Sequence, residues 1–172
     1  PVCVAVGSML IGILLGTRGL VMKAQREGVP ANADVMLELA ERVDQAGLDS
    51  VWVGDSLVSK PRLEPVAAMS AIAMRTKHVR IGTAVMLPAL RHSVPLAHGL
   101  ATADVLSHGR IVIGAGVGGA FTPGQAQDWI AAGVDPKTRA GRFTELVQAA
   151  GAACTGCGEP MGETRRASGM SH

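Results

Sequence analysis

Four short apolar runs, each rich in β-branched residues, restrict the folds open to this chain more than any other feature. The runs are Ile11–Leu15, Val51–Val53, Val79–Val85 and Ile111–Ile113. They lack the regular apolar–polar alternation of a half-buried strand, and such runs are typical of strands that are buried on both faces of a sheet. Their first residues lie 40, 28 and 32 positions apart, which leaves room for a helix between consecutive strands.

Helical patterns fill these intervals. The first repeats Val35, Leu39 and Val43 at helical spacing, and Gly47 follows where a C-cap belongs. The four expected helices run from Val35 to Gly47, from Pro65 to Thr76, from Ser93 (as the cap) to Gly109, and onward from Asp135 with Pro136 at the first helical position. The order β-α-β-α-β-α-β-α predicts an α/β fold with parallel strands and right-handed crossovers.

The composition excludes several classes of protein. With 48% hydrophobic and 17% charged residues, the chain is too apolar to be disordered. A net charge of +2, with two Phe, two Trp and no Tyr, provides neither a basic stripe nor rings for base stacking, so we expect no nucleic-acid partner. Three cysteines are too few for a disulfide scaffold and fit a reduced, cytoplasmic setting. The pair Cys154 and Cys157 lacks the further ligands of a zinc site, and we expect no metal.

The ends of the chain differ from its middle. Residues 1–17 carry no charge, but the first basic residue, Arg18, follows the apolar run instead of preceding it, which argues against a signal peptide. The run is also shorter than the roughly 20 residues of a membrane-spanning helix, so we expect no membrane partner. We therefore expect an extra leader at residues 1–9, one domain at 10–153 and an irregular tail at 154–172.

Candidate chemistry belongs where parallel strands end, because α/β folds bind ligands beyond the carboxyl ends of their strands. Asp55 follows the second run, and it can act as a general acid or base, hydrogen-bond a ligand ring, or close an Asx turn. His92 is the imidazole near a strand end, where a helix-capping role is also open to it. Arg91 can bind a phosphate or a carboxylate, or remain a solvated loop residue.

Glycines after the fourth run match the dinucleotide-binding pattern G-x-G-x-x-G at Gly114, Gly116 and Gly119. In an NAD-dependent dehydrogenase such glycines let a pyrophosphate approach a helix N-terminus. That motif normally follows the first strand and leads directly into a helix, whereas Phe121, Thr122, Pro123 and Gly124 follow here. The other interpretation is that the glycines thin the backbone, so that a flat ligand or a neighbouring loop can approach.

Taken in order, these segments resemble the bacterial luciferase-like flavin-dependent oxidoreductases, the luciferase-like monooxygenase family. The resemblance is carried by RIGTAVMLPALRHSVPLAHGLATADVLSHGRIVIGAGVGG at residues 80–119, by LIGILLGTRGLVM at 10–22 and by ELAERVDQAGLDSVWVGDS at 38–56. It implies a TIM-type (β/α)₈ barrel that binds FMN or the deazaflavin coenzyme F-420. The implied reaction is hydride transfer to or from a small organic substrate, or its monooxygenation.

The resemblance also implies site residues. In this family a bulged third strand, often with a non-prolyl cis peptide, supports the middle ring of the flavin, and here it falls at Thr83, Ala84 and Val85. The end of the second strand places Asp55 and Ser56 near that ring as candidate catalytic residues. The loop after the fourth strand is expected near the cofactor's chain and phosphate, at Gly116, Val117, Gly118 and Gly119. Luciferases and several deazaflavin dehydrogenases carry a catalytic histidine where this sequence has Ser56, so luciferase chemistry itself is not expected.

Four βα units are expected, whereas a closed barrel of this type needs eight strands. The resemblance therefore implies the N-terminal half of such an enzyme. A half barrel leaves two open sheet edges and an apolar face, so we expect it to need the remaining half or a partner copy, as in a homodimer. A non-catalytic half barrel that only associates is a third interpretation, beside the flavin oxidoreductase and the NAD-dependent dehydrogenase.

Overall fold

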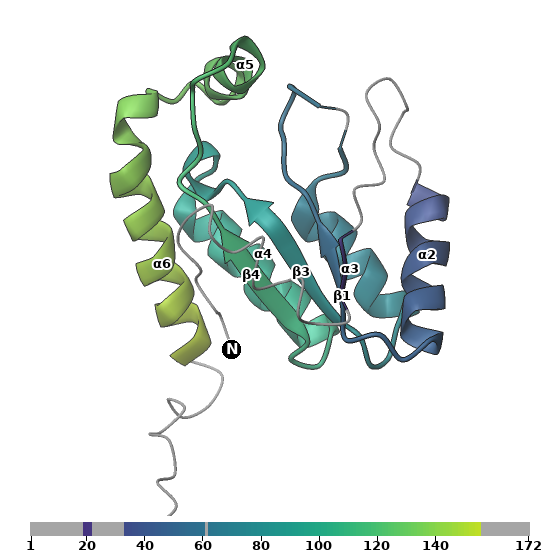
Figure 1. Ribbon diagram of the computed structural model, residues 1–172. Helices are drawn as coiled ribbons and strands as arrows, with labels where there is room; N and C mark the ends of the chain where they lie inside the picture. The colour runs from purple at the N-terminus through teal and green to yellow at the C-terminus, as the bar shows by residue number, and fades with distance from the viewer. Residues whose placement is uncertain (1–18, 22–32, 61, 156–172) are drawn as a thin grey trace, which may run out of the picture.

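Four parallel strands form the sheet of this protein (Figure 1). The structure, a computed structural model, describes residues 19–21, 33–60 and 62–155. The strands are β1 (Gly19–Val21), β2 (Ser50–Val53), β3 (Arg80–Met86) and β4 (Ile111–Ala115), and they pair in the order β1-β2-β3-β4. This sequential order is that of a barrel, because a doubly wound sheet reverses its strand order at a switch point.

Helices line one face of the sheet. The α-helices are α2 (Ala33–Gln45), α3 (Pro65–Arg75), α4 (Ser93–Leu106), α5 (Pro123–Ala132) and α6 (Arg139–Thr155), and short 3₁₀ helices lie at η2 (Pro88–Leu90) and η3 (Pro136–Thr138). Helix α2 packs against α3, α3 against α4, and α4 against α6. Figure 1 shows these four on a single side of the sheet, with α5 past the carboxyl end of β4. The predicted α/β fold, a parallel barrel of the TIM type that is incomplete, is confirmed.

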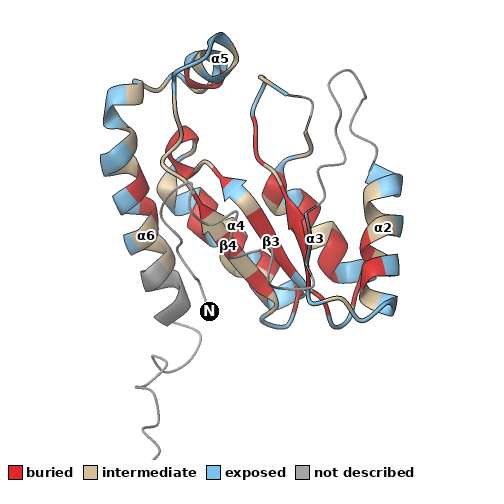
Figure 2. Ribbon diagram, in the orientation of Figure 1, coloured by how far each residue is buried: buried red, intermediate tan, exposed pale blue. Residues whose placement is uncertain are grey.

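The main core lies between the sheet and the helices. Figure 2 shows the buried residues concentrated on the strands and on the helix surfaces that face them. Val51 and Ile81 from the strands pack in one cluster with Met69 and Ile72 of α3, and all four are essentially inaccessible to solvent. A smaller cluster joins η2 to α5 through Ala89, Leu90 and Trp129. The first cluster fixes the layers, and the second attaches α5 to the end of β3.

Asp44 fixes the turn that leads into β3. Its carboxylate accepts hydrogen bonds from the backbone N–H groups of Lys77, His78 and Val79 at 2.7–2.8 Å. Burial raises the pKa of the Asp44 carboxyl, but these three hydrogen bonds and the nearby charge of His78 outweigh it and hold the pKa below its usual value. The side chain therefore joins the end of α2 to the start of the next βα unit.

Arg110 has the corresponding role at the start of β4. Its guanidinium donates five hydrogen bonds of 2.7–3.0 Å, which satisfy carbonyl and hydroxyl oxygens at Ala73, Thr76, Val79 and Ser107. Several of these carbonyls belong to the last turns of α3 and α4, which have no intrahelical partners. Burial lowers the pKa of Arg110 below its usual value, although the charge of Asp44 opposes this.

Several element boundaries differ from the expectation. The run Ile11–Leu15 lies outside the described residues, and the first described strand is Gly19–Val21. Ser93 is the first residue of α4 and not its cap, which is His92. Asp135 caps the 3₁₀ helix η3, and α6 begins only at Arg139.

Helix α5 was not expected from the sequence. Thr122 caps it by accepting a hydrogen bond from the N–H of Gln125, whose side-chain oxygen accepts from the N–H of Thr122 in return. This Thr-x-x-Gln arrangement is a capping box, which is a signal readable in the sequence. Gly124 in the first turn and the glycines before it favour a loop by propensity, and they hid that signal.

The predicted domain limits are only partly described. Helix α6 continues to Thr155, beyond the expected boundary at residue 153, while residues 1–9 and 156–172 lie outside the described part of the chain. Among the helices that are described, none combines the length and the apolar character needed to cross a membrane.

Candidate active site

Small residues form a flat floor on the helix-free face of the sheet, at the carboxyl ends of the strands. Val53 pairs with Thr83, and Ala84 pairs with Gly114, so that Gly54, Ala84 and Gly114 continue one row across three strands. Val53 belongs to the core on the helix side, and strand alternation therefore directs Gly54 to the opposite face. The largest side chain within this row is the methyl group of Ala84, and the guanidinium of Arg62 lies over Gly54, where an added Cβ atom would come within 2.0 Å of it.

The row below the floor is covered by an indole ring. Trp52 pairs with Gly82, and a Cβ atom at Gly82 would lie 2.5 Å from the Trp52 ring. The ring also reaches towards Gly114, where an added Cβ would lie 3.9 Å from it. The indole N–H donates to the hydroxyl of Ser50 at 2.8 Å, which fixes the ring's orientation. An aromatic surface therefore adjoins the floor from the amino side of the strands.

The third strand carries the expected bulge. The β3–β4 register passes from Ala84↔Gly114 to Met86↔Ala115, which leaves Val85 unpaired, and the Ala84–Val85 peptide is cis. The bulge and the non-prolyl cis peptide expected at residues 83–85 are thus confirmed. The side chain of Val85 is 44% exposed, whereas Thr83 is fully buried and donates its hydroxyl to the Gly114 carbonyl at 2.9 Å. Of the three residues, Ala84 lies on the floor, Val85 stands beside it, and Thr83 holds the strands together.

The glycine segment after β4 is fixed by α5. The N–H of Gly116 donates to Met86, and a Cβ atom at Gly116 would lie 3.2 Å from Val85. Gly118 has a φ of +80° and lies against the ring of Trp129, whose indole N–H donates to the Gly119 carbonyl at 2.8 Å. Close approach of a bulge and an indole ring thus explains the absence of side chains here. Between these glycines, Val117 packs against the main core.

Asp55 is engaged by the protein itself. Its two carboxylate oxygens accept from the Arg91 guanidinium at 2.7 and 2.8 Å, and one of them also accepts from the N–H of Leu87 at 2.8 Å. The side chain is fully buried, and Glu64 lies 3.4 Å from the same guanidinium. Burial lowers the pKa of Arg91, but its hydrogen bonds and charge interactions with Asp55 and Glu64 raise it above the usual value overall. This bidentate pair joins the end of β2 to the residues after β3.

Ser56 belongs to a second cluster, built around Asp128 of α5. Asp128 accepts from the N–H groups of Val58 and Ser59 at 2.8 and 2.9 Å and from the Ser59 hydroxyl at 2.7 Å. The Ser56 hydroxyl lies 2.9 Å from that of Ser59, reaches Asp128 at 3.4 Å and accepts from the N–H of Lys60. Burial raises the pKa of Asp128, but these hydrogen bonds outweigh it and hold the pKa below its usual value. The cluster ties the loop after β2 to α5.

The structure therefore separates the predicted site residues into two groups. Ala84 lies on the floor, and Val85 and Gly116 lie next to it. Asp55 and Ser56 lie at the same end of the sheet, but their side chains form hydrogen bonds with neighbouring loops. The side chain of His92 is exposed at the start of α4 and makes no capping hydrogen bond. Sequence reasoning missed Gly54 as part of the floor, because the row depends on strand register. It missed Asp128, which anchors the loop after β2, because α5 itself was not expected.

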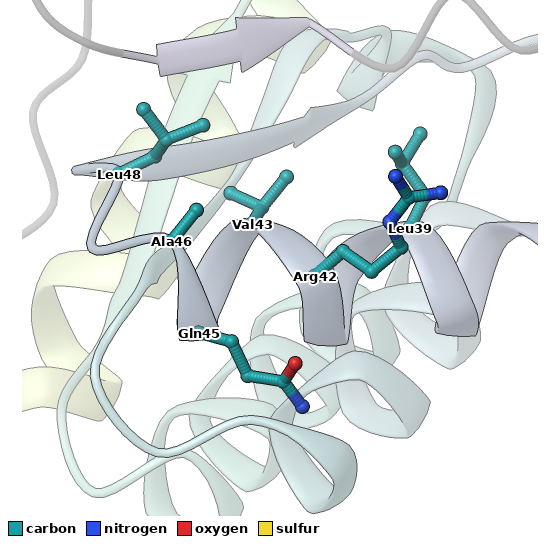
Figure 3. A pocket seen from close by; sticks show the side chains of 6 residues that line it. All are labelled: Leu39, Arg42, Val43, Gln45, Ala46 and Leu48. Carbon is teal, nitrogen blue, oxygen red and sulfur yellow. The ribbon is translucent and has the colours of Figure 1, made fainter.

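The described residues also form a groove away from the floor. A groove of about 530 Å³ lies at the end of α2, between Leu39, Val43, Ala46 and Leu48, with Arg42 and Gln45 at its edge (Figure 3). These residues belong to the last turns of α2 and to the turn leading into β2, at the amino ends of the strands, so the groove is separate from the floor. Within the described ranges, no group of three His, Cys, Asp or Glu residues is placed to hold a metal ion.

The chain is similar to proteins of one family. A sequence model described as luciferase-like monooxygenase matches residues 9–169. The F420-dependent glucose-6-phosphate dehydrogenase of Amycolatopsis mediterranei is 41% identical over 93 residues, which make up 50% of this chain and 28% of that protein. The oxygenase component of the flavin-dependent trigonelline monooxygenase of Acinetobacter baylyi is 32% identical over 83 residues, 47% of this chain and 23% of that protein.

Solved structures give the same result. The crystal structure of the monooxygenase RslO1 from Streptomyces bottropensis superposes with a TM-score of 0.60 and 31% identity, over 69% of this chain and 35% of that one. The chain thus spans about a quarter of the length of the two curated relatives and about a third of the solved one.

Proposed function

We propose, from the premise that this chain belongs to the luciferase-like monooxygenase family, that it holds a flavin or deazaflavin ring on the part of the floor that Ala84 and Gly114 form. The enzyme would be an oxidoreductase that acts on a small organic substrate. The cofactors are suggested by the relatives, which are F420-dependent or flavin-dependent by name. Because this chain spans only part of those relatives, the activity and substrate are proposed for the protein of which it forms the barrel's first units.

The observation that carries this proposal is the flatness of the floor. A planar ring needs a surface without protruding side chains, and on the neighbouring strands β3 and β4 the residues Ala84 and Gly114 present only backbone and one methyl group, with the Arg62 guanidinium beside them over Gly54. Val85 rises beside this surface, and the Trp52 indole adjoins it from below. A bound FMN would supply hydride transfer or oxygen activation, and a deazaflavin would supply hydride transfer.

The chain's own residues would orient the ring and shield it from water. Ala84 and Gly114 would contact its face, and Val85 with Gly116 would border it at the bulge. Asp55 would act as a positioning residue, since its pair with Arg91 fixes where β2 and β3 end. Ser56 would likewise hold the loop after β2 over the site, through Ser59 and Asp128.

The NAD-dependent dehydrogenase fits less well. A dinucleotide-binding sheet has helices on both faces and reverses its strand order, whereas these strands run sequentially and the helices that pack on them share one face. In addition, Gly118 and Gly119 are occupied by contacts with Trp129. The non-catalytic half barrel predicts the same fold without ligand binding, so a binding measurement separates it from the proposed enzyme.

Titration of the chain with FMN and with coenzyme F-420, followed by fluorescence, tests the proposal. We expect saturable binding of one of them and at least a tenfold weaker affinity in Ala84→Leu, because a leucine on the floor would occupy the ring's place. Ala140→Leu is the matched control, since Ala140 is exposed on α6. Absence of binding by the unaltered chain, or equal affinities for the two variants, would contradict a ring on this floor.

A further inference from the structure

Arg62 lies on the floor itself. A Cβ atom at Gly54 would lie 2.0 Å from Nη1 of Arg62 and 2.7 Å from its guanidinium carbon. The guanidinium therefore occupies the space where a side chain at position 54 would stand, on the helix-free face of the sheet. Nη1 donates to the Asp55 carbonyl at 3.3 Å, which holds the group at the carboxyl end of β2.

The charge of Arg62 is left uncompensated by its neighbours. Asp55 and Glu64, the carboxylates nearest to it along the chain, are both engaged by Arg91. Within the described residues, Arg62 forms no ion pair, and its one hydrogen bond is to a backbone carbonyl. A half-buried guanidinium with free N–H donors is suited to bind an anionic or carbonyl oxygen of a ligand.

We propose that Arg62 binds the electronegative pyrimidine edge of the ring that the floor holds; this inference rests on the proposed function. Neighbouring strands lie about 4.8 Å apart, so a ring over Ala84 and Gly114 brings one edge to the guanidinium above Gly54. Flavins and deazaflavins share a ring nitrogen, N1, next to the C2 carbonyl oxygen on this edge, and these two adjacent acceptors match the paired N–H donors of arginine. Arg62 thus decides which edge of the ring faces β2.

This contact favours the reduced ring. Two-electron reduction places negative charge on the pyrimidine edge when the reduced ring ionises there, and a cation at that edge binds the reduced form more tightly than the oxidised form. If Arg62 raises that preference tenfold, the two-electron reduction potential of the bound ring rises by about 30 mV. Arg62 would therefore set both the orientation and the redox balance of the ring.

The test measures binding and potential in Arg62→Ala and Arg62→Lys with FMN and riboflavin, or with F-420 and deazariboflavin if the deazaflavin is the form that binds. We expect Arg62→Ala to weaken binding of the oxidised ring about tenfold, equally with and without the phosphate-bearing chain, and to weaken binding of the reduced ring about tenfold more, which lowers the potential of the bound ring by about 30 mV. Arg62→Lys should recover part of each effect. Lys60→Ala, which removes an exposed cation from the same loop, should leave both unchanged.

Each alternative has its own outcome. Weakening with FMN but not with riboflavin would assign Arg62 to the phosphate and overturn the ring-edge contact. An unchanged affinity and potential in Arg62→Ala would overturn the inference while leaving the proposed function intact. If the unaltered chain binds none of these compounds, the proposed function fails and the inference fails with it.

Discussion

At the scale of single residues, the glycines of the floor are required by close contacts and not by turn geometry. An added Cβ atom at Gly114 would lie 2.3 Å from the Thr83 carbonyl oxygen, which belongs to the neighbouring strand. That oxygen belongs to the backbone of β3, so it cannot move aside without disturbing the strand. A substitution here therefore disturbs the sheet as well as the proposed ring site.

We predict that Gly114→Ala lowers the free energy of unfolding by about 1–3 kcal/mol, as overpacking does in well-packed interiors. Gly141→Ala is the matched control, because nothing lies within 4 Å of its added Cβ and alanine favours the α6 helix by up to about 1 kcal/mol. Urea unfolding of the two variants checks this. Equal stability of both would show that β4 tolerates the methyl group.

The second prediction at this scale concerns acid. The pKa of Asp44 is lower in the folded chain than its usual value of 3.8, so its hydrogen bonds contribute stability that is complete above that value. This contribution is lost as the pH falls through the folded-state pKa. We predict that Asp44→Asn is less stable than the unaltered chain at pH 7 and that the difference narrows below about pH 4. Urea midpoints between pH 7 and pH 3 measure it, and a constant difference would contradict it.

At the scale of elements, the strand entrances depend on single polar side chains. Arg110 satisfies five acceptors with one planar group, and a lysine offers three donors on a flexible stem. We predict that Arg110→Lys lowers the free energy of unfolding by about 2–4 kcal/mol, because buried carbonyls at the end of α3 lose their partners. Arg80→Lys, at the exposed start of β3, should change it by less than about 0.5 kcal/mol. Similar losses in both variants would contradict this role.

The elements that sequence reasoning found are those with local signals. Helix α3 begins at Pro65 and ends next to Thr76 as expected, because proline at the first position and apolar periodicity are properties of neighbouring residues. Helix α5 was missed because its capping box stands among glycines. The bulge at Val85 came from the family resemblance, since nothing in the composition of β3 distinguishes a bulge from a regular strand.

At the scale of the whole molecule, the described sheet has two free edges. Among the described strands, β1 pairs only with β2, and β4 pairs only with β3. Unpaired strand edges and an apolar sheet face favour association. We predict that the chain is at least a dimer in solution, with a mass of about twice 17.6 kDa or more by light scattering.

Val112→Lys tests which surface is responsible. Val112 pairs with Gly82 below the floor, on the helix-free face of an edge strand, and a charge there would oppose burial against a second copy. We expect the variant to shift towards the monomer. Val94→Lys, on the exposed outer side of α4, is the control and should keep the mass of the unaltered chain. A monomeric unaltered chain, or a shift caused by Val94→Lys alone, would contradict association through this face.

The sequence by itself determined the order of strands and helices and their parallel arrangement, because these follow from periodicity and from the short reach of βα connections. Only the tertiary structure decided what the polar residues at that end do. Asp55 meets Arg91 across 36 positions, and Ser56 meets Asp128 across 72. Such contacts depend on strand register and on where a loop returns, which no local pattern encodes. The same holds for the floor, since three small residues become a surface only when register sets them side by side.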